Sequence, residues 1–134
     1  MLKTALDDLK TALDTALPTR VVTRSLRDFT QHQLSDLEAG ILTLISHRES
    51  GYANYRGREA DLGKLAIITV GQLKLPENAA PSDVEDAEFA FAEEVKTFLQ
   101  TVLPVEAVIL LETRFSGQLE APYGWFAMDW EVWP

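Results

Sequence analysis

Two histidines and several paired carboxylates are the side chains of this chain whose types could bind a metal or move protons. His32, His47 and Glu49 supply the two imidazoles and one carboxylate of a non-haem iron site. Nothing in their spacing brings His32 beside the other two, so we interpret both histidines as surface or loop residues. Asp129 and Glu131 alternate on one face of an expected strand, as an acid and base pair can. We interpret them as solvent-facing charges of an antiparallel sheet.

The sequence lacks the short motifs that mark common catalytic and phosphate sites. It contains no GxSxG, GxxxxGKS/T, GxGxxG or HExxH. Its 134 residues include no cysteine, which excludes disulfides, thiol catalysis and zinc sites built on thiolates. The net charge of −9 argues against a protein that coats duplex nucleic acid. We therefore expect no enzyme, no catalytic or metal residues, and no sequence readout of nucleic acid.

The charges are distributed unevenly along the chain. Residues 1–61 are nearly balanced, whereas residues 62–134 carry 12 acidic side chains against 4 basic ones. Arginines gather around residues 20–27 and again around residues 48–58. Two such different patches suit head-to-tail association, in which unlike surfaces meet and the rotation can close a ring. The alternative interpretation is that both patches are simply solvated.

Apolar periodicity predicts two long helices. Apolar residues recur at three- and four-residue steps over residues 2–17, and Pro18 ends that pattern. Ser82 with Glu85 forms a capping box, from which an apolar stripe on an otherwise acidic helix runs to Pro104.

Five further segments have the composition of strands: residues 20–26, 41–46, 65–75, 105–115 and 123–133. In the last strand Phe126, Met128, Trp130 and Val132 are expected to share one face. Residues 27–39 form a loop with a helical turn in this interpretation, and residues 76–81 a linker. Residues 47–61 form a long polar loop, which is too long for a tight hairpin turn.

The order α-β-β-β-α-β-β predicts a single α+β domain over residues 1–134. We expect a two-layer sandwich in which a mainly antiparallel sheet carries two helices on one face. No apolar run reaches the roughly 18–20 residues that a membrane helix needs, and the N-terminus has no export signal. We expect a cytoplasmic protein without a membrane partner.

The succession of elements resembles that of the tail-terminator, or tail-completion, proteins of long-tailed bacteriophages and Mu-like prophages. The likeness lies in order and pattern over nearly the whole chain. It rests on the amphipathic helix that ends at Leu17-Pro18, the strands 41–46 and 65–70, the proline linker, the acidic helix from Ser82 and the aromatic closing strand 124–132.

The resemblance implies a structural protein of the virion, with no cofactor and no reaction. Such proteins assemble as rings, commonly hexameric, on the head-proximal end of the tail tube, where they stop its growth. The implied partners are further copies of the chain, the tail tube protein and head–tail connector proteins. The implied locations are the host cytoplasm during assembly and then the virion tail.

The residues themselves suggest which side chains make a subunit or tube interface, because arginine and tyrosine are enriched at interface centres. The arginine-rich side of this predicted interface is Arg48, Tyr52, Tyr55, Arg56 and Arg58, and its acidic counterpart is Glu85, Asp86 and Glu93.

Two other functions are compatible with the sequence. One is a small dimeric module that binds a ligand or peptide, with Trp125, Trp130 and Trp133 lining a pocket. The other is a metal-dependent hydrolase, which would need acidic residues converging from different elements.

Overall fold

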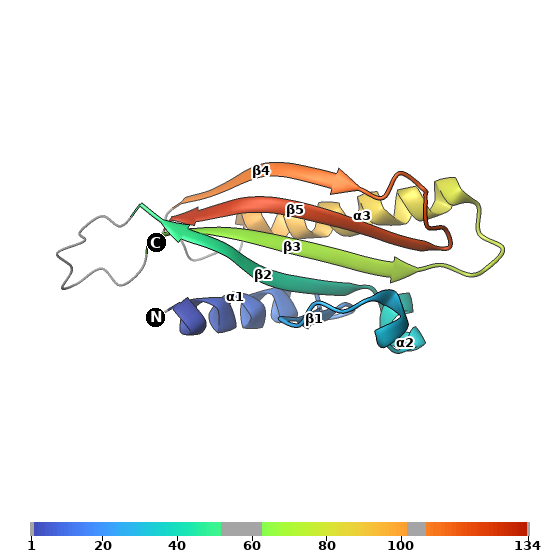
Figure 1. Ribbon diagram of the computed structural model, residues 1–134, viewed down its shortest axis with the longest axis horizontal. Coiled ribbons are helices and arrows are strands. Elements are labelled where there is room, and N and C mark those ends of the chain that lie inside the picture. The colour runs from blue at the N-terminus through green and yellow to red at the C-terminus, as the bar shows by residue number, and fades with distance from the viewer. Residues whose placement is uncertain (1, 52–62, 102–106, 134) are drawn as a thin grey trace.

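The computed structural model describes residues 2–51, 63–101 and 107–133. They form a sheet in the order β1-β2-β3-β5-β4, with two long helices against one of its faces (Figure 1). The strands are β1 Val21–Thr23, β2 Ile41–Ser50, β3 Lys64–Lys74, β4 Ala107–Phe115 and β5 Tyr123–Trp133. The helices are α1 Leu2–Ala16, α2 Leu34–Ala39, α3 Pro81–Thr101 and a 3-10 turn, η1 Phe29–Gln31. This confirms the predicted α+β sandwich.

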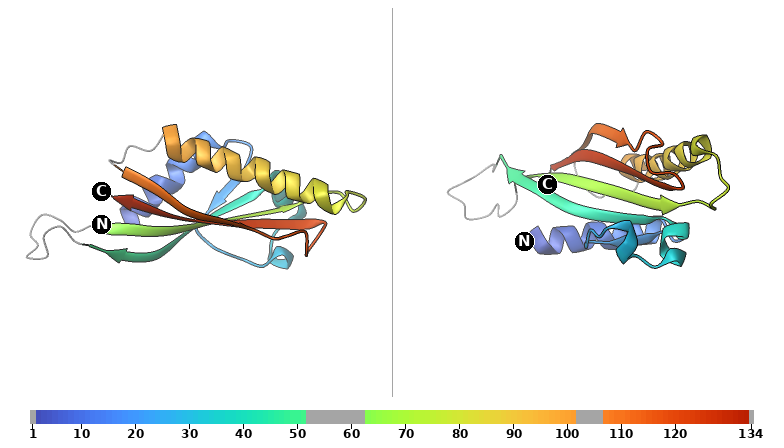
Figure 2. Two further views of the ribbon diagram at one scale, coloured as in Figure 1. Left: turned by 90° about the horizontal axis from the view of Figure 1, so that it is seen from above. Right: turned by 45° about the vertical axis from the view of Figure 1, so that its right-hand side comes forward.

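The sheet is antiparallel except at one edge. β2 pairs with β3, β3 with β5, and β5 with β4, all antiparallel, whereas the short β1 runs parallel to β2. A parallel neighbour requires the chain to cross over between the two strands. Residues 24–40 make that crossing through η1 and α2, where the sequence suggested only a loop with a helical turn. In Figure 2 this segment passes to the face of the sheet opposite α1 and α3.

The predicted polar loop of residues 47–61 is wrong at its start, because residues 47–50 belong to β2. Arg48 lies opposite Ala66, and Ser50 lies opposite Lys64. These polar residues extend β2 because the long β3 runs alongside them and pairs with their backbone. The Glu49 side chain also accepts a hydrogen bond from the Gly63 N–H at 3.3 Å. Residues 52–62 of the predicted loop lie outside the described part of the chain.

The predicted capping box at Ser82 and Glu85 is also wrong. The helix begins two residues earlier than that box implies, at Pro81, whose fixed φ and missing N–H suit the first helical position. The third helical residue is therefore Asp83. Its carboxylate accepts the N–H of Ala80 at 3.1 Å, which is the role predicted for Glu85.

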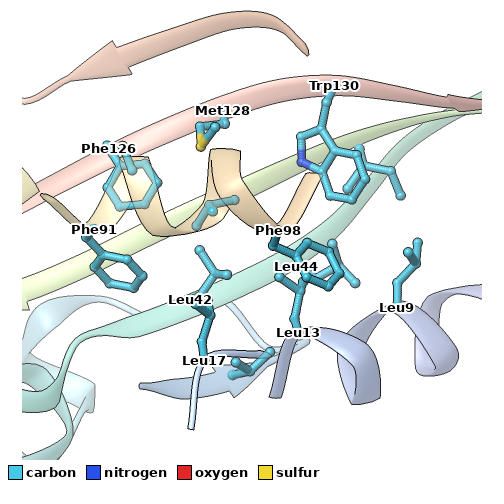
Figure 3. Close-up of a cluster of buried hydrophobic side chains, with 14 of the residues drawn as sticks. Leu9, Leu13, Leu17, Leu42, Leu44, Phe91, Phe98, Phe126, Met128 and Trp130 are labelled. Atoms are coloured by element: carbon cyan, nitrogen blue, oxygen red, sulfur yellow. The ribbon is translucent and has the colours of Figure 1, made fainter. Parts of the chain in front are cut away.

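The core lies between the sheet and the two long helices (Figure 3). The alternation predicted for the last strand is confirmed, since Phe126, Met128 and Trp130 are all almost completely buried. Gly71 on β3 leaves room for the Phe126 ring, because a Cβ at residue 71 would lie only 2.0 Å from that ring. The ring of Phe126 also packs edge-on against Phe91 of α3. Close packing of this kind fixes α3 over the centre of the sheet.

Candidate interaction surface

The sheet face opposite α1 and α3 carries alternating apolar and charged side chains. Ala66, Ile68 and Val70 of β3 point to this face and are partly exposed. Asp129 of β5 lies directly beside Ile68 in the register. Residues 24–40 pack on one end of this face, where Gln72 donates to the carbonyl of Arg27 at 2.9 Å.

A groove of about 430 Å³ lies on this face over the first half of β3 and the second half of β5. Its lining includes His47 and Arg48 of β2, Ile68 of β3, Leu111 and Arg114 of β4, and Asp129 of β5.

Two β-bulges shape the groove. The register of β2 on β3 shifts between Ser46 and Arg48, which leaves His47 as the extra residue. The register of β4 on β5 shifts between Leu110 and Glu112, which leaves Leu111 as the extra residue. Bulges re-aim side chains, and they are over-represented at functional sites and sheet edges. Both extra residues line the same groove, although they come from strands that do not pair with each other.

The groove contains one arginine that is ion-paired and one that is not. Arg114 Nη2 lies 3.4 Å from Asp129 Oδ1 across β4 and β5, and its side chain is half exposed. Arg48 is exposed and pairs with no carboxylate of the described residues. Among the described arginines of this groove, Arg48 is therefore the one that a partner's carboxylate can reach without displacing an ion pair to another described residue.

The structure places Arg48 and the acidic residues of the predicted interface on opposite faces of the sheet. Arg48 lines the groove, whereas Glu85, Asp86 and Glu93 lie on α3, which packs on the other face (Figure 2). Glu85 accepts a hydrogen bond from Gln118 Nε2 at 3.2 Å, and Glu93 pairs with Lys96 at 3.1 Å. The remaining predicted interface residues, Tyr52, Tyr55, Arg56 and Arg58, lie outside the described part of the chain.

Two of the three arginines around β1, Arg20 and Arg24, are occupied within the chain. Arg20 pairs with Glu94 of α3, donates to the carbonyl of Ala39 and stacks over the Phe91 ring at 4.2 Å. Arg24 pairs with Asp7 of α1 at 2.8 Å. Hydrogen bonds from Lys3 and then Arg24 hold the pKa of Asp7 below its usual value. These two arginines hold helices in place and do not extend the basic side of the interface.

One acidic residue of α3, Glu88, is buried, which the count of acidic side chains in residues 62–134 did not reveal. Its side chain is completely buried. It accepts hydrogen bonds from the Ser116 hydroxyl, from the Ser116 N–H at 3.3 Å and from the Trp125 N–H at 3.2 Å. Burial raises the pKa of Glu88, and the bonds from Ser116 and Trp125 partly oppose that rise.

A sequence signal for this burial existed. Glu88 lies four residues after Val84 and four before Ala92, and both of these are buried on the sheet-facing stripe of α3. Gly124 makes the contact possible, since a Cβ there would lie 2.6 Å from the carboxylate. The carboxylate is thus enclosed between α3 and the strands that flank the β4–β5 turn.

The other side chains considered for chemistry lie apart. His32 is bonded to Gln72 at 3.1 Å near η1, whereas His47 lines the groove. Within residues 2–51, 63–101 and 107–133, no group of three His, Asp or Glu side chains could hold a metal ion. Trp130 is buried in the core, and Trp125 precedes it by an odd number of residues and so faces the other side of the strand. These two tryptophans do not line one pocket.

Comparison with models of known protein families finds no match to this chain, and comparison with curated proteins finds none either. No helix in the described ranges is long and apolar enough to cross a membrane.

Proposed function

We propose that this chain is a structural protein without catalytic activity that associates head to tail with copies of itself. In the form that the resemblance implies, the copies close into a ring that caps the head-proximal end of a phage tail tube. Assembly then takes place in the host cytoplasm, and the ring remains in the virion tail. The observation that carries the proposal is the groove on the uncovered sheet face, built by two bulges and holding Arg48.

The arrangement of charge supports head-to-tail rather than symmetric contact. Arg48 lies on one face, and the exposed carboxylates of α3 lie on the other. Within one copy these groups cannot pair. A two-fold contact uses one shared patch on both copies, whereas a head-to-tail contact brings the unlike faces of successive copies together and repeats until a ring closes.

Capping follows from a difference between the two faces of such a ring. One face must complement the last ring of the tube, and the other must lack the surface that recruits a further tube subunit. Packing and charge complementarity are sufficient for this function, and no reacting group is needed.

Light scattering tests the association, measured over a range of protein concentration at low and high salt. The proposal predicts a defined ring-sized species that salt weakens, because exposed ion pairs are screened within about 10 Å at 0.1 M salt. A ring whose mass does not change with salt would support self-association and contradict the proposed charged contact. A monomer at every concentration would count against self-association.

Electron microscopy tests the capping step. Tubes of a phage tail tube protein would be assembled with and without this chain. Shorter tubes with a single ring at one end are expected. Tubes of unchanged length, with no density added at either end, would contradict the capping role while leaving ring formation open to the scattering experiment.

The groove also favours one alternative, a small dimeric module that binds a ligand or peptide. Its volume of about 430 Å³ lies within the range of ligand sites, roughly 300–1,000 Å³. A tight dimer in the same scattering experiment, independent of salt, would move this alternative ahead of the ring.

A further inference from the structure

We propose that the β4–β5 turn of one copy, led by Leu119, docks into the groove on the uncovered sheet face of the next copy. The occupant of the groove is thus a second copy of this chain. This inference rests on the proposed self-association and names the two surfaces that make it.

Leu119 has the features of an anchor side chain. It is 87% exposed, more than any other large apolar side chain in the described residues. It lies in the turn between Phe115 and Tyr123, at one end of the elongated molecule (Figure 1). An apolar side chain held this far into solvent gains stability when a partner covers it, by about 25 cal/mol for each Å² buried.

The turn that carries Leu119 is held from both sides. At its start the buried Glu88 accepts from Ser116, and at its end Glu88 accepts from the Trp125 N–H. Gln118, next to Leu119, has a left-handed φ of 68° and donates through Nε2 to Glu85. Because the turn is ordered before contact, docking loses little conformational entropy.

The groove has the complementary shape and composition. Ile68 and Leu111 supply apolar contacts within it, and Leu111 is itself 58% exposed. Its volume of about 430 Å³ can accept a leucine with part of its turn. Burying the two exposed leucines against each other removes both from water in a single contact.

Charge favours the same pairing. Glu120 follows Leu119 directly, and Glu85 is hydrogen-bonded to Gln118, so carboxylates flank the anchor. Asp86 is exposed on the neighbouring turns of α3. In the groove, Arg48 pairs with no carboxylate of the described residues. The groove also contains the carboxylates of Asp129 and Glu131, and Arg114 pairs with Asp129. Arg48 is therefore the group that carboxylates beside the turn can meet, and this one contact orients the docking.

The positions of the two surfaces require a second copy. The turn lies at the end of the molecule where α3 begins, whereas the groove lies toward the end where β5 finishes (Figure 1). A turn that Glu88 and Glu85 hold in place cannot reach the groove of its own chain. A turn-into-groove contact made in one direction is heterologous, so it propagates from copy to copy and can close a ring, whereas two copies that dock reciprocally would stop at a two-fold dimer.

Cross-linking tests the contact directly, because the natural chain has no cysteine to interfere. One chain carries Leu119→Cys and a second, distinguishable by an affinity tag, carries Leu111→Cys. The two are mixed and treated with a short bis-maleimide linker, and the products are identified by mass spectrometry. The matched control replaces Leu111→Cys by Leu34→Cys, since Leu34 on α2 is 53% exposed.

The expected result is about tenfold more 119–111 product than 119–34 product, because docking raises the local concentration of the paired thiols. Equal yields in the two mixtures, while the unmodified chain still forms rings, would overturn this contact and leave the proposed function standing. Equal yields with a chain that stays monomeric would overturn both. A dominant 119–119 product would show a symmetric turn-to-turn contact and overturn the inference.

A second variant tests the same contact without cross-linking, by measuring assembly itself. Leu119→Asp places a charge on the anchor at an exposed position, so the fold is expected to tolerate it. The concentration of half-assembly, measured by light scattering, should rise about tenfold or more. An unchanged half-assembly concentration would mean that Leu119 is not buried between copies.

Discussion

Truncation of Glu88 to alanine removes the acceptor that ties α3 to both ends of the β4–β5 turn. The Trp125 N–H loses this acceptor, and the Ser116 hydroxyl loses its partner. The Ser116 N–H keeps a second acceptor, the Trp125 carbonyl at 3.1 Å. An N–H left without its acceptor costs about 1–3 kcal/mol, and the lost hydroxyl bond about 0.5–1.5 kcal/mol.

Two further effects act in opposite directions. Removing the side chain leaves a cavity beside Val84, which destabilises the fold. Removing a buried carboxylate also removes the free-energy cost of its desolvation, which stabilises the fold. Taking these as partly cancelling, we expect Glu88→Ala to lose about 2–3 kcal/mol of unfolding free energy, mainly through the broken hydrogen bonds.

Urea unfolding followed by tryptophan fluorescence measures this loss. With a slope of about 1–3 kcal/mol per molar urea, the midpoint should fall by roughly 0.7–3 M. Asp86→Ala is the matched control, since Asp86 is an exposed acid of the same helix, and its change should stay within about 0.5 kcal/mol. A Glu88→Ala midpoint equal to that of Asp86→Ala would refute the role assigned to the buried carboxylate.

Three more predictions follow from the same contacts. Burial raises the folded-state pKa of Glu88 above 4.5, so the wild type should lose stability relative to Glu88→Gln as pH rises through that pKa. The unfolding free energies of the two proteins should converge below about pH 4. Parallel curves of unfolding free energy over the whole pH range would contradict the shift. Gly71→Ala should lower the unfolding free energy by about 1–3 kcal/mol in urea, because the new Cβ overlaps the Phe126 ring, and an unchanged midpoint would contradict that overlap. Arg20→Met loses the ion pair with Glu94 and also the hydrogen bond to the Ala39 carbonyl, so we expect a loss of about 1–2 kcal/mol that becomes smaller, without vanishing, in a Glu94→Gln background; an equal loss in both backgrounds would show that the ion pair contributes nothing.

Much of the fold could be predicted because its signals are local. The apolar spacing in α1 and α3 predicts which side of each helix is buried. The alternation along the last strand does the same for Phe126, Met128 and Trp130. The parallel pairing of β1 with β2 could not be read from these signals. It depends on where residues 24–40 return the chain, and that path is set by contacts such as Gln72 with Arg27 and His32, which lie far apart in the sequence.

The candidate site was less predictable for the same reason. Arg48 stood out by its residue type, but Leu111 and Arg114 join it only through the register of four strands. The bulges that expose His47 and Leu111 leave no mark in composition, since each is a mismatch between two paired strands. The burial of Glu88 was not predicted, although the spacing places this residue on the apolar stripe of α3.

The central claim, self-association through the uncovered sheet face, is tested most directly by the solution mass of one matched pair of variants. Leu111→Glu places a carboxylate in the groove, and Leu34→Glu places one on α2 at a similarly exposed leucine. Light scattering at a concentration where the wild type is assembled should show a lower mass for Leu111→Glu and the wild-type mass for Leu34→Glu. An assembled mass retained by Leu111→Glu would contradict the claim that copies meet through this face.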